Sequence, residues 1–191
     1  MKEYNLRTID STNDEAKRII KSGMEENFFI VADEQTAGRG QFERTFFSPH
    51  STGLYLSVAL KLTESLSSSF ITQATAVAVC DSIDTLHNIK LGIKPVNDLF
   101  LHGRKVGGIL VETMVNFAQE SYFAIFGIGL NLYAPAGGFP QEIENSASHI
   151  FDKVIDKTEL IHKITDTLLR FSGNFEEPAI AAKYRERVIG K

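Results

Sequence analysis

The order of the apolar segments along the chain is the feature that most restricts its fold. Short apolar runs typical of strands are interrupted by one long helical pattern at 65–87 and are followed by further helical patterns near the C-terminus. Strands and helices therefore do not alternate regularly, as they do in a parallel α/β sheet. This order predicts the α+β class, with a mixed, mostly antiparallel sheet and helices packed on one side.

Periodicity and turn signals predict the individual elements. Strands are expected at 4–9, 28–35, 53–60 and 89–93, on either side of a turn at His102-Gly103, and within 121–135. We expect the last of these strands to pair antiparallel with 106–114, across a loop at 116–120. Helices are expected at 10–23, 65–87, 159–171 and 179–188.

Length and composition indicate a single globular domain over residues 1–191. The chain has 191 residues, of which 43% are hydrophobic, so it can bury a sizeable core without disulfides or structural metals. Cys80 is the one cysteine, which excludes an internal disulfide, and its apolar neighbours predict a core position. The 5 histidines show no metal-ligand spacing.

Charge and hydropathy exclude two classes of partner. The formal net charge is −4, and no run of Lys or Arg exceeds two residues, which argues against nucleic acid as a partner. The sequence contains no apolar stretch of ~18 residues and begins without the apolar segment of a secretory signal. We therefore expect a soluble cytoplasmic protein without a membrane partner.

The segment TAGRGQFERTFFSPH, at 36–50, predicts a cationic loop between two strands. Gly38 and Gly40 would let the backbone approach a ligand, and Arg39 could pair with a phosphate through two hydrogen bonds. Arg44 adds a second positive charge, and Phe46 could cover a planar group. The loop lacks the GK[ST] ending of a phosphate-binding Walker loop. The alternative interpretation is an ordinary polar connection.

Two further segments combine glycine, lysine and acidic or amide residues. In GRKVGGILVE, Lys105 precedes Gly107 and Gly108 at a strand entrance, where its ammonium could neutralise a phosphoryl or acyl-phosphate group. In KPVNDLF, Asn97 and Asp98 could contribute oxygen ligands to Mg²⁺. The alternatives are a turn lysine and a common turn pair.

The segments DSTNDEAK and GIGLNLY carry the remaining candidates. Ser11 and Thr12 lie at the expected start of a helix, where N–H groups favour polar or anionic ligands, although both could simply cap the helix. Asn131 interrupts an apolar strand and needs hydrogen-bond partners there. It could contact an adenine edge or bind the backbone.

Taken in order, these segments resemble the biotin protein ligases. The resemblance extends from about Tyr4 to Leu132, through STN, the GRG loop, NDLFLHGRKVGGILVE and GIGLNLY, and GFPQEI and the C-terminal helices are also similar. It implies the α+β catalytic fold shared with class II aminoacyl-tRNA synthetases. It also implies a two-step reaction, in which biotin and MgATP form biotinyl-5′-AMP and a carrier-protein lysine then takes the biotin.

The resemblance implies specific roles for the candidate residues. Lys105 and Arg39 are expected to be catalytic, because cations must offset the repulsion between biotin's carboxylate and ATP. Contacts to biotin are implied for Ser11, Thr12, Asn13, Gln35, Gly38, Arg39, Gly40, Lys105, Gly107 and Gly108. Contacts to ATP are implied for Arg39, Arg44, Phe46, Asn97, Asp98, Lys105 and Asn131. Asn97 and Asp98 are the implied Mg²⁺ ligands. The implied partner is a biotin carboxyl carrier domain of acetyl-CoA carboxylase or a similar enzyme, and the resemblance leaves a homodimer open.

The sequence departs from the family pattern at two motifs. Pro95 stands where the family has tryptophan, which removes an aromatic ring and a backbone donor. In the loop, Gln41, Phe42 and Glu43 replace an arginine, a variable residue and a glycine, and Phe46 replaces tryptophan. Neither an N-terminal DNA-binding domain nor the small C-terminal β-barrel of many members is expected within 1–191.

Two rival functions follow from the same residues. One is a lipoate or octanoate ligase on the same scaffold, and the other is a binding protein that keeps affinity for biotin or its adenylate without turnover. Hydroxyl and amide groups that match the ureido ring of biotin favour the biotin ligase, because hydrogen bonds discriminate better than apolar contacts.

Overall fold

The computed structural model describes residues 1–62, 67–116, 121–173 and 177–190. The strands are β1 (Lys2–Ile9), β2 (Phe28–Gln35), β3 (Gly53–Leu62), β4 (Gly92–Lys94), β5 (Asp98–Leu101), β6 (Arg104–Asn116) and β7 (Ser121–Asn131). The helices are α1 (Thr12–Lys21), α2 (Ser68–His87), α3 (Lys157–Gly173) and α4 (Glu177–Arg187), with a short 3-10 turn at Gln41–Glu43. Most expected elements are confirmed, although the strand expected at 89–93 is the shorter β4.

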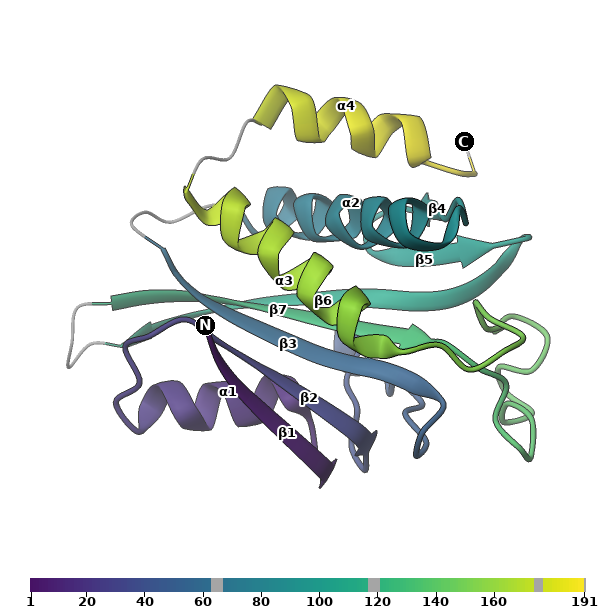
Figure 1. The fold of residues 1–191 in the computed structure, drawn as a ribbon, viewed down its shortest axis with the longest axis horizontal. Coiled ribbons are helices and arrows are strands. Elements are labelled where there is room, and N and C mark those ends of the chain that lie inside the picture. Colours follow the sequence, from purple (N-terminus) through teal and green to yellow (C-terminus); the bar gives the residue numbers. More distant parts are fainter. Residues whose placement is uncertain (63–66, 117–120, 174–176, 191) are drawn as a thin grey trace.

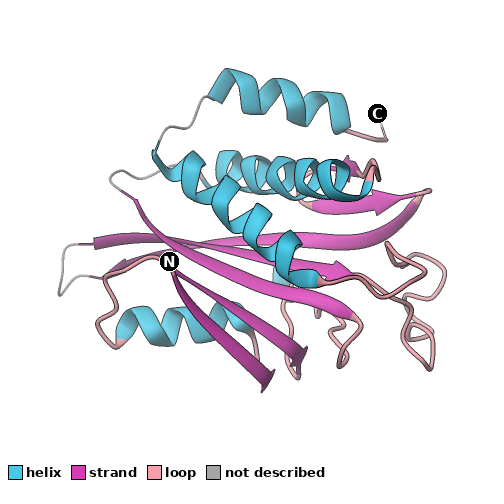
Figure 2. Cartoon of the chain, viewed as in Figure 1, coloured by secondary structure: helices cyan, strands magenta, loops and turns pink. Residues whose placement is uncertain are grey.

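The strands form one 7-stranded sheet in the order β1-β2-β3-β7-β6-β5-β4 (Figure 1; Figure 2). Only β1 and β2 pair in parallel, whereas the other pairs are antiparallel. The expected pairing between 106–114 and the last strand is confirmed, since Gly107 lies opposite Leu130 and Met114 opposite Phe123. Part of the loop expected between them, 117–120, lies outside the described residues.

The turn between β5 and β6 shows why these two strands are adjacent. His102 and Gly103 both have positive φ, 49° and 78°. Two successive positive φ values are typical of the hairpin turns whose twist matches that of the flanking strands. The expected turn is thereby confirmed, and it brings Asp98 opposite Gly108.

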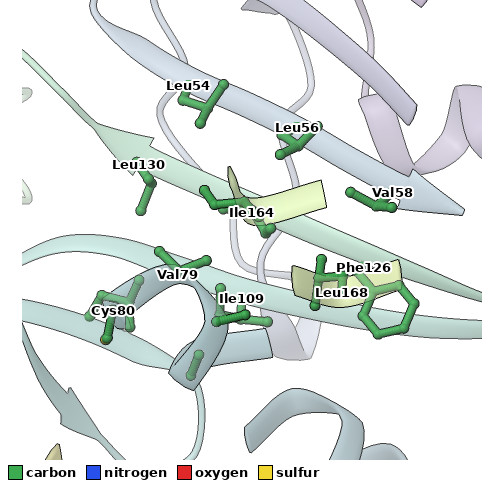
Figure 3. Packing of buried hydrophobic residues seen from close by; sticks show 14 of the residues in the cluster. Leu54, Leu56, Val58, Val79, Cys80, Ile109, Phe126, Leu130, Ile164 and Leu168 are labelled. Atoms are coloured by element: carbon green, nitrogen blue, oxygen red, sulfur yellow. The ribbon is translucent and has the colours of Figure 1, made fainter. Parts of the chain in front are cut away.

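Helices cover both faces of the sheet, which corrects the prediction that they pack on one side. On one face, α2, α3 and α4 bury apolar residues against alternate positions of β3, β6 and β7, as Figure 3 shows for Leu56, Ile109 and Ile164. On the other face, α1 packs Ala16 and Ile20 against β2, β3 and β7 (Figure 1). Because successive side chains of a strand point to opposite faces, both layers draw on the same strands.

The long helix α2 is the centre of the larger core. Cys80 is 0% exposed, as the sequence predicted, and burial raises the pKa of its thiol to about 12. The C-terminal helix α4 is held against α2 by ion pairs from Lys183 and Arg187 to Asp81. None of the helices in the described part of the chain is long and apolar enough to cross a membrane.

Candidate active site

A cavity of about 570 Å³ opens where the start of α1, the loop after β2 and the β4–β5 turn meet strands β6 and β7. Its floor is formed by backbone and small side chains of the sheet, including Gly108, Gly127 and Gly129. A Cβ atom at Gly127 would lie 2.4 Å from Oδ1 of Asn13, and one at Gly129 would lie 2.6 Å from the ring of Phe46. Glycine at these positions therefore makes room for α1 and the loop.

The wall formed by α1 is a hydrogen-bonded network of polar side chains. Oε1 of Gln35 accepts hydrogen bonds from the backbone N–H and the hydroxyl of Thr12, at 2.9 and 3.1 Å. The hydroxyl of Ser57, 0% exposed, lies 2.7 Å from Oγ1 of Thr12 and 2.6 Å from Oδ1 of Asn13. Nε2 of Gln35 in turn donates to Ser48. These contacts fix the orientation of the amides and hydroxyls before any ligand enters.

Ser11 occupies the N-cap position of α1 but makes no side-chain capping hydrogen bond. Its side chain lines the cavity, and the residue is 2% exposed. Thr12 directs its hydroxyl to Gln35 and Ser57. Ser11 is thus the N-cap by position but makes no capping hydrogen bond through its side chain, and the contacts of both residues with biotin stay predictions.

Arg39 enters the cavity from the loop and is held by two carboxylates. Its Nη2 donates to Asp14 at 2.7 Å and to Glu112 at 2.8 Å. Lys17 pairs with the same two acids, at 3.3 and 2.7 Å. Burial acts to raise the pKa of Glu112, but hydrogen bonds from Lys17 and Asn13 and the nearby charges outweigh it, so the pKa lies below its ordinary value.

Lys105 reaches the same cavity from the start of β6. Its ammonium pairs with Asp98 at 2.5 Å, and both side chains remain partly exposed, at 37% and 29%. Two hydrogen bonds fix Asn97 to the backbone of Ile109. Its side-chain Nδ2 donates to the Ile109 carbonyl at 2.8 Å, and its own carbonyl accepts from the Ile109 N–H at 2.9 Å. The departure at Pro95 therefore leaves Asn97 anchored to β6.

The described residues contain no group of three or more His, Cys, Asp or Glu side chains able to hold a metal ion. Asp98 and Asn97 offer one carboxylate and one amide oxygen beside the cavity. Such a pair fits Mg²⁺ that arrives bound to phosphate oxygens and keeps some of its waters. Their role as Mg²⁺ ligands stays a prediction.

The cavity brings together most of the residues singled out in the sequence. Those that line it are Ser11, Thr12, Asn13, Gln35, Arg39, Gly40, Arg44, Phe46, Asn97, Asp98, Lys105 and Gly108. Gly38, Gly107 and Asn131 are not among the lining residues.

These three residues instead have structural surroundings. A Cβ at Gly38 would lie 2.5 Å from the carbonyl oxygen of Phe46, and one at Gly107 would lie 2.6 Å from that of Gly129. Asn131 donates to the carbonyl of Ser148 at 3.0 Å, which is the backbone contact that the sequence left open. Their contacts with biotin or ATP stay predictions.

Sequence reasoning missed Ser57 and Glu112. Ser57 is a hydroxyl within the apolar run GLYLSVAL, and Glu112 is the acid that ends GGILVE. A polar residue inside a buried strand needs partners, so each of these interruptions was a usable signal. The partners themselves, which come from α1 and the loop, lie too far away in the sequence to be inferred from it.

Comparisons with known proteins agree with this arrangement. The model of the biotin/lipoate A/B protein ligase family matches residues 6–131. The chain belongs to this family. A bifunctional ligase/repressor BirA of Bacillus spizizenii is 31% identical over 172 residues, which cover 88% of this chain and 52% of that protein. A biotin–[acetyl-CoA-carboxylase] ligase of Mycobacterium tuberculosis is 28% identical, over 94% of this chain and 68% of that protein. The chain thus spans about half the length of this BirA and of the BirA of Bacillus subtilis that it also matches.

Solved structures show the same fold. A biotin protein ligase from Aquifex aeolicus, in complex with biotin and ATP, aligns with a TM-score of 0.79 at 23% identity. The alignment covers 98% of this chain and 78% of the Aquifex chain. One from Leishmania major, in complex with biotinyl-5-AMP, has the same TM-score and identity. The predicted α+β fold of the biotin protein ligases is confirmed.

Proposed function

We propose that the chain is the catalytic domain of an ATP-dependent biotin protein ligase. The observation that carries this proposal is that Arg39 and Lys105, 66 positions apart in sequence, line one cavity whose α1 wall presents fixed amides and hydroxyls. The family includes ligases for both biotin and lipoate, so its membership alone leaves the acid open. The polar wall supports biotin as the acid.

The α1 wall suits the ureido ring of biotin, which has two N–H donors and a carbonyl acceptor. Ser11, Thr12, Asn13 and Gln35 supply oxygen acceptors and N–H or O–H donors there. A lipoyl group has no hydrogen-bonding ring to satisfy them. A site that hydrogen-bonds a polar substrate group can discriminate by orders of magnitude against an analogue that lacks the group, whereas one methylene in an apolar pocket is worth only about 1–3 kcal/mol.

The first step joins two anions. A carboxylate oxygen of biotin attacks the α-phosphorus of ATP, the bond to the β-phosphate bridging oxygen breaks, and pyrophosphate leaves. Lys105 and Arg39 would offset the negative charge at the α-phosphate and the carboxylate as it builds up in the transition state. Mg²⁺ arrives with ATP as part of the substrate, and Asp98 and Asn97 are the side chains that would meet it.

In the second step, the ε-amine of a carrier-protein lysine attacks the acyl carbon and AMP leaves. We propose a biotin carboxyl carrier domain of acetyl-CoA carboxylase or a similar enzyme as this partner, in the cytoplasm and without nucleic acid or a membrane. The Arg39–Arg44 loop would shield the adenylate from water between the two steps. The same proposal treats residues 1–191 as a single catalytic domain and leaves open whether the domain forms a homodimer.

The test is exchange of labelled pyrophosphate into ATP, run with biotin and separately with lipoate. Biotin-dependent exchange supports the proposal, and exchange with lipoate alone would select a lipoate ligase. Tight biotin binding without exchange would select a binding protein. Transfer of labelled biotin to a purified carrier domain then tests the second step.

A further inference from the structure

Glu112 lies at the boundary between the cavity and the core under α1. On β6 it shares a face with Gly108 and Leu110, which line the cavity, and with Met114, which packs against the α1 core. Glu112 is not itself among the lining residues. Any influence it has on a bound ligand must therefore pass through the side chains that it holds.

The Glu112 carboxylate gathers donors from two other parts of the chain. Oε1 accepts from Lys17 at 2.7 Å, and Oε2 accepts from Asn13 at 2.9 Å and from Arg39 at 2.8 Å. One carboxylate thus connects the start of α1, the GRG loop and β6. Its side chain is 22% exposed, so these contacts are less screened than those of a surface pair.

The arrangement leaves Arg39 with capacity to bind a ligand. Both carboxylate contacts use Nη2, whereas Nε is buried and has no hydrogen-bond partner among the described residues. A buried N–H without a partner is costly and is satisfied when an acceptor arrives. The second carboxylate, Asp14, also holds Lys17, so two acids and two cations form a closed, neutral group.

We infer that Glu112 is a positioning residue, which holds Arg39 and Asn13 in the orientation that the ligand meets. This inference rests on the proposed function, because it assigns Arg39 to the same anion site. Without the Glu112 carboxylate, Arg39 keeps only the more exposed Asp14 as an ion-pair partner, and Asn13 loses one of its two acceptors. The loop and the α1 wall would then no longer be fixed to the same strand.

The first test needs no turnover. Trypsin cleavage after Arg39 in the ligand-free chain should become about tenfold faster in Glu112→Gln, because the variant keeps the shape but lacks the charge. Cleavage after the exposed Lys153 reports general loosening and should not change. Glu25→Gln, the same change at an exposed position, is the control. Unchanged cleavage after Arg39, or an equal rise at Lys153, overturns the inference.

The second test is a double-mutant cycle in the exchange assay. Glu112→Gln should lower kcat/KM for biotin by about tenfold with Arg39 present and by a clearly smaller factor in an Arg39→Ala background, where only the contact with Asn13 is left to lose. A purely structural role would give the same factor in both backgrounds and would overturn the inference. Glu112→Asp, which keeps the charge on a shorter stem, replaces the glutamine variant if that variant does not fold.

The two tests separate this inference from the proposed function. If the wild-type chain shows no biotin-dependent exchange, the proposed function fails, whereas the cleavage experiment still decides whether Glu112 fixes the loop. If the wild type is active and the cycle is additive, only the role of Glu112 is overturned.

Discussion

The ammonium of Lys105 lies 2.5 Å from a carboxylate oxygen of Asp98, on the strand paired with its own, and both side chains line the cavity. Arg39 is likewise paired, with Asp14 and Glu112. Both of the cations proposed to act on the substrates are therefore held by an acid before an anionic ligand enters. The acid keeps the cation oriented while the site is empty. An incoming carboxylate or phosphate then has to share the cation with that acid or displace it.

Lys105→Ala should reduce biotin-dependent pyrophosphate exchange by orders of magnitude, because a cation beside the α-phosphate is lost where charge develops. The ammonium is partly exposed, at 37%, so the free energy of unfolding should change by less than about 1 kcal/mol. Exchange kinetics and urea denaturation measure the two effects. Lys153→Ala, an exposed lysine outside the cavity, is the control, and near-normal turnover of the Lys105 variant would remove this residue from the mechanism.

Gly129→Ala should displace the loop that carries Arg39. The added Cβ would lie 2.6 Å from Cε1 of Phe46, so the ring must move, and overpacking of this kind costs about 1–3 kcal/mol. We expect weaker biotin binding by calorimetry together with a lower melting temperature. Gly137→Ala meets no atom within 4 Å and should behave like the wild type. Unaltered binding by the Gly129 variant would show that Phe46 moves without consequence for the cavity.

Ser57→Ala tests the buried polar wall. The variant leaves Oδ1 of Asn13 without its 2.6 Å donor, and a buried acceptor without a partner costs about 1–3 kcal/mol. We expect that loss in the free energy of unfolding and a raised KM for biotin, since Asn13 and Thr12 are no longer fixed. Ser82→Ala is the matched buried control and should cost less, because its hydroxyl donates to the Ala78 carbonyl within α2, and a helical carbonyl already accepts a backbone N–H. Equal effects of the two substitutions would contradict a special role for Ser57.

The buried thiol of Cys80 should make stability fall at alkaline pH. Burial raises its pKa to about 12 in the folded chain, against about 8.5 in the unfolded chain, so only the unfolded state releases the proton between these values. The stability is therefore complete below about pH 8.5 and is lost as the pH rises towards 12. Between pH 7 and 10, the wild type should lose about 1–2 kcal/mol more than Cys80→Ala does.

Urea denaturation at both pH values measures this difference. A thiol reagent supplies an independent check, because Cys80 should react in urea and remain protected in the native chain. Parallel pH profiles for the wild type and Cys80→Ala would contradict the prediction. Tyr55, whose pKa burial raises to about 12, contributes equally to both profiles and cancels in the comparison.

The sequence by itself determined the elements that depend on neighbouring residues. The turn at His102-Gly103, the long helix with Cys80 at its buried face and the antiparallel pairing of β6 with β7 all follow from local periodicity and turn chemistry. The candidate residues of the GRG loop and of GRKVGG were also visible, because a cation beside glycines is a local pattern. These features were predictable because the interactions that fix them span only a few residues.

Only the tertiary structure decided which face each helix covers and which side chains meet. The apolar pattern of α1 showed that it packs on a sheet, but not that it takes the face opposite α2 and α3. Glu112 is 73 positions from Arg39, and Ser57 is 44 positions from Asn13. Contacts over such separations depend on strand order and register, which are set by packing of the whole sheet, so no local pattern in the sequence specifies them.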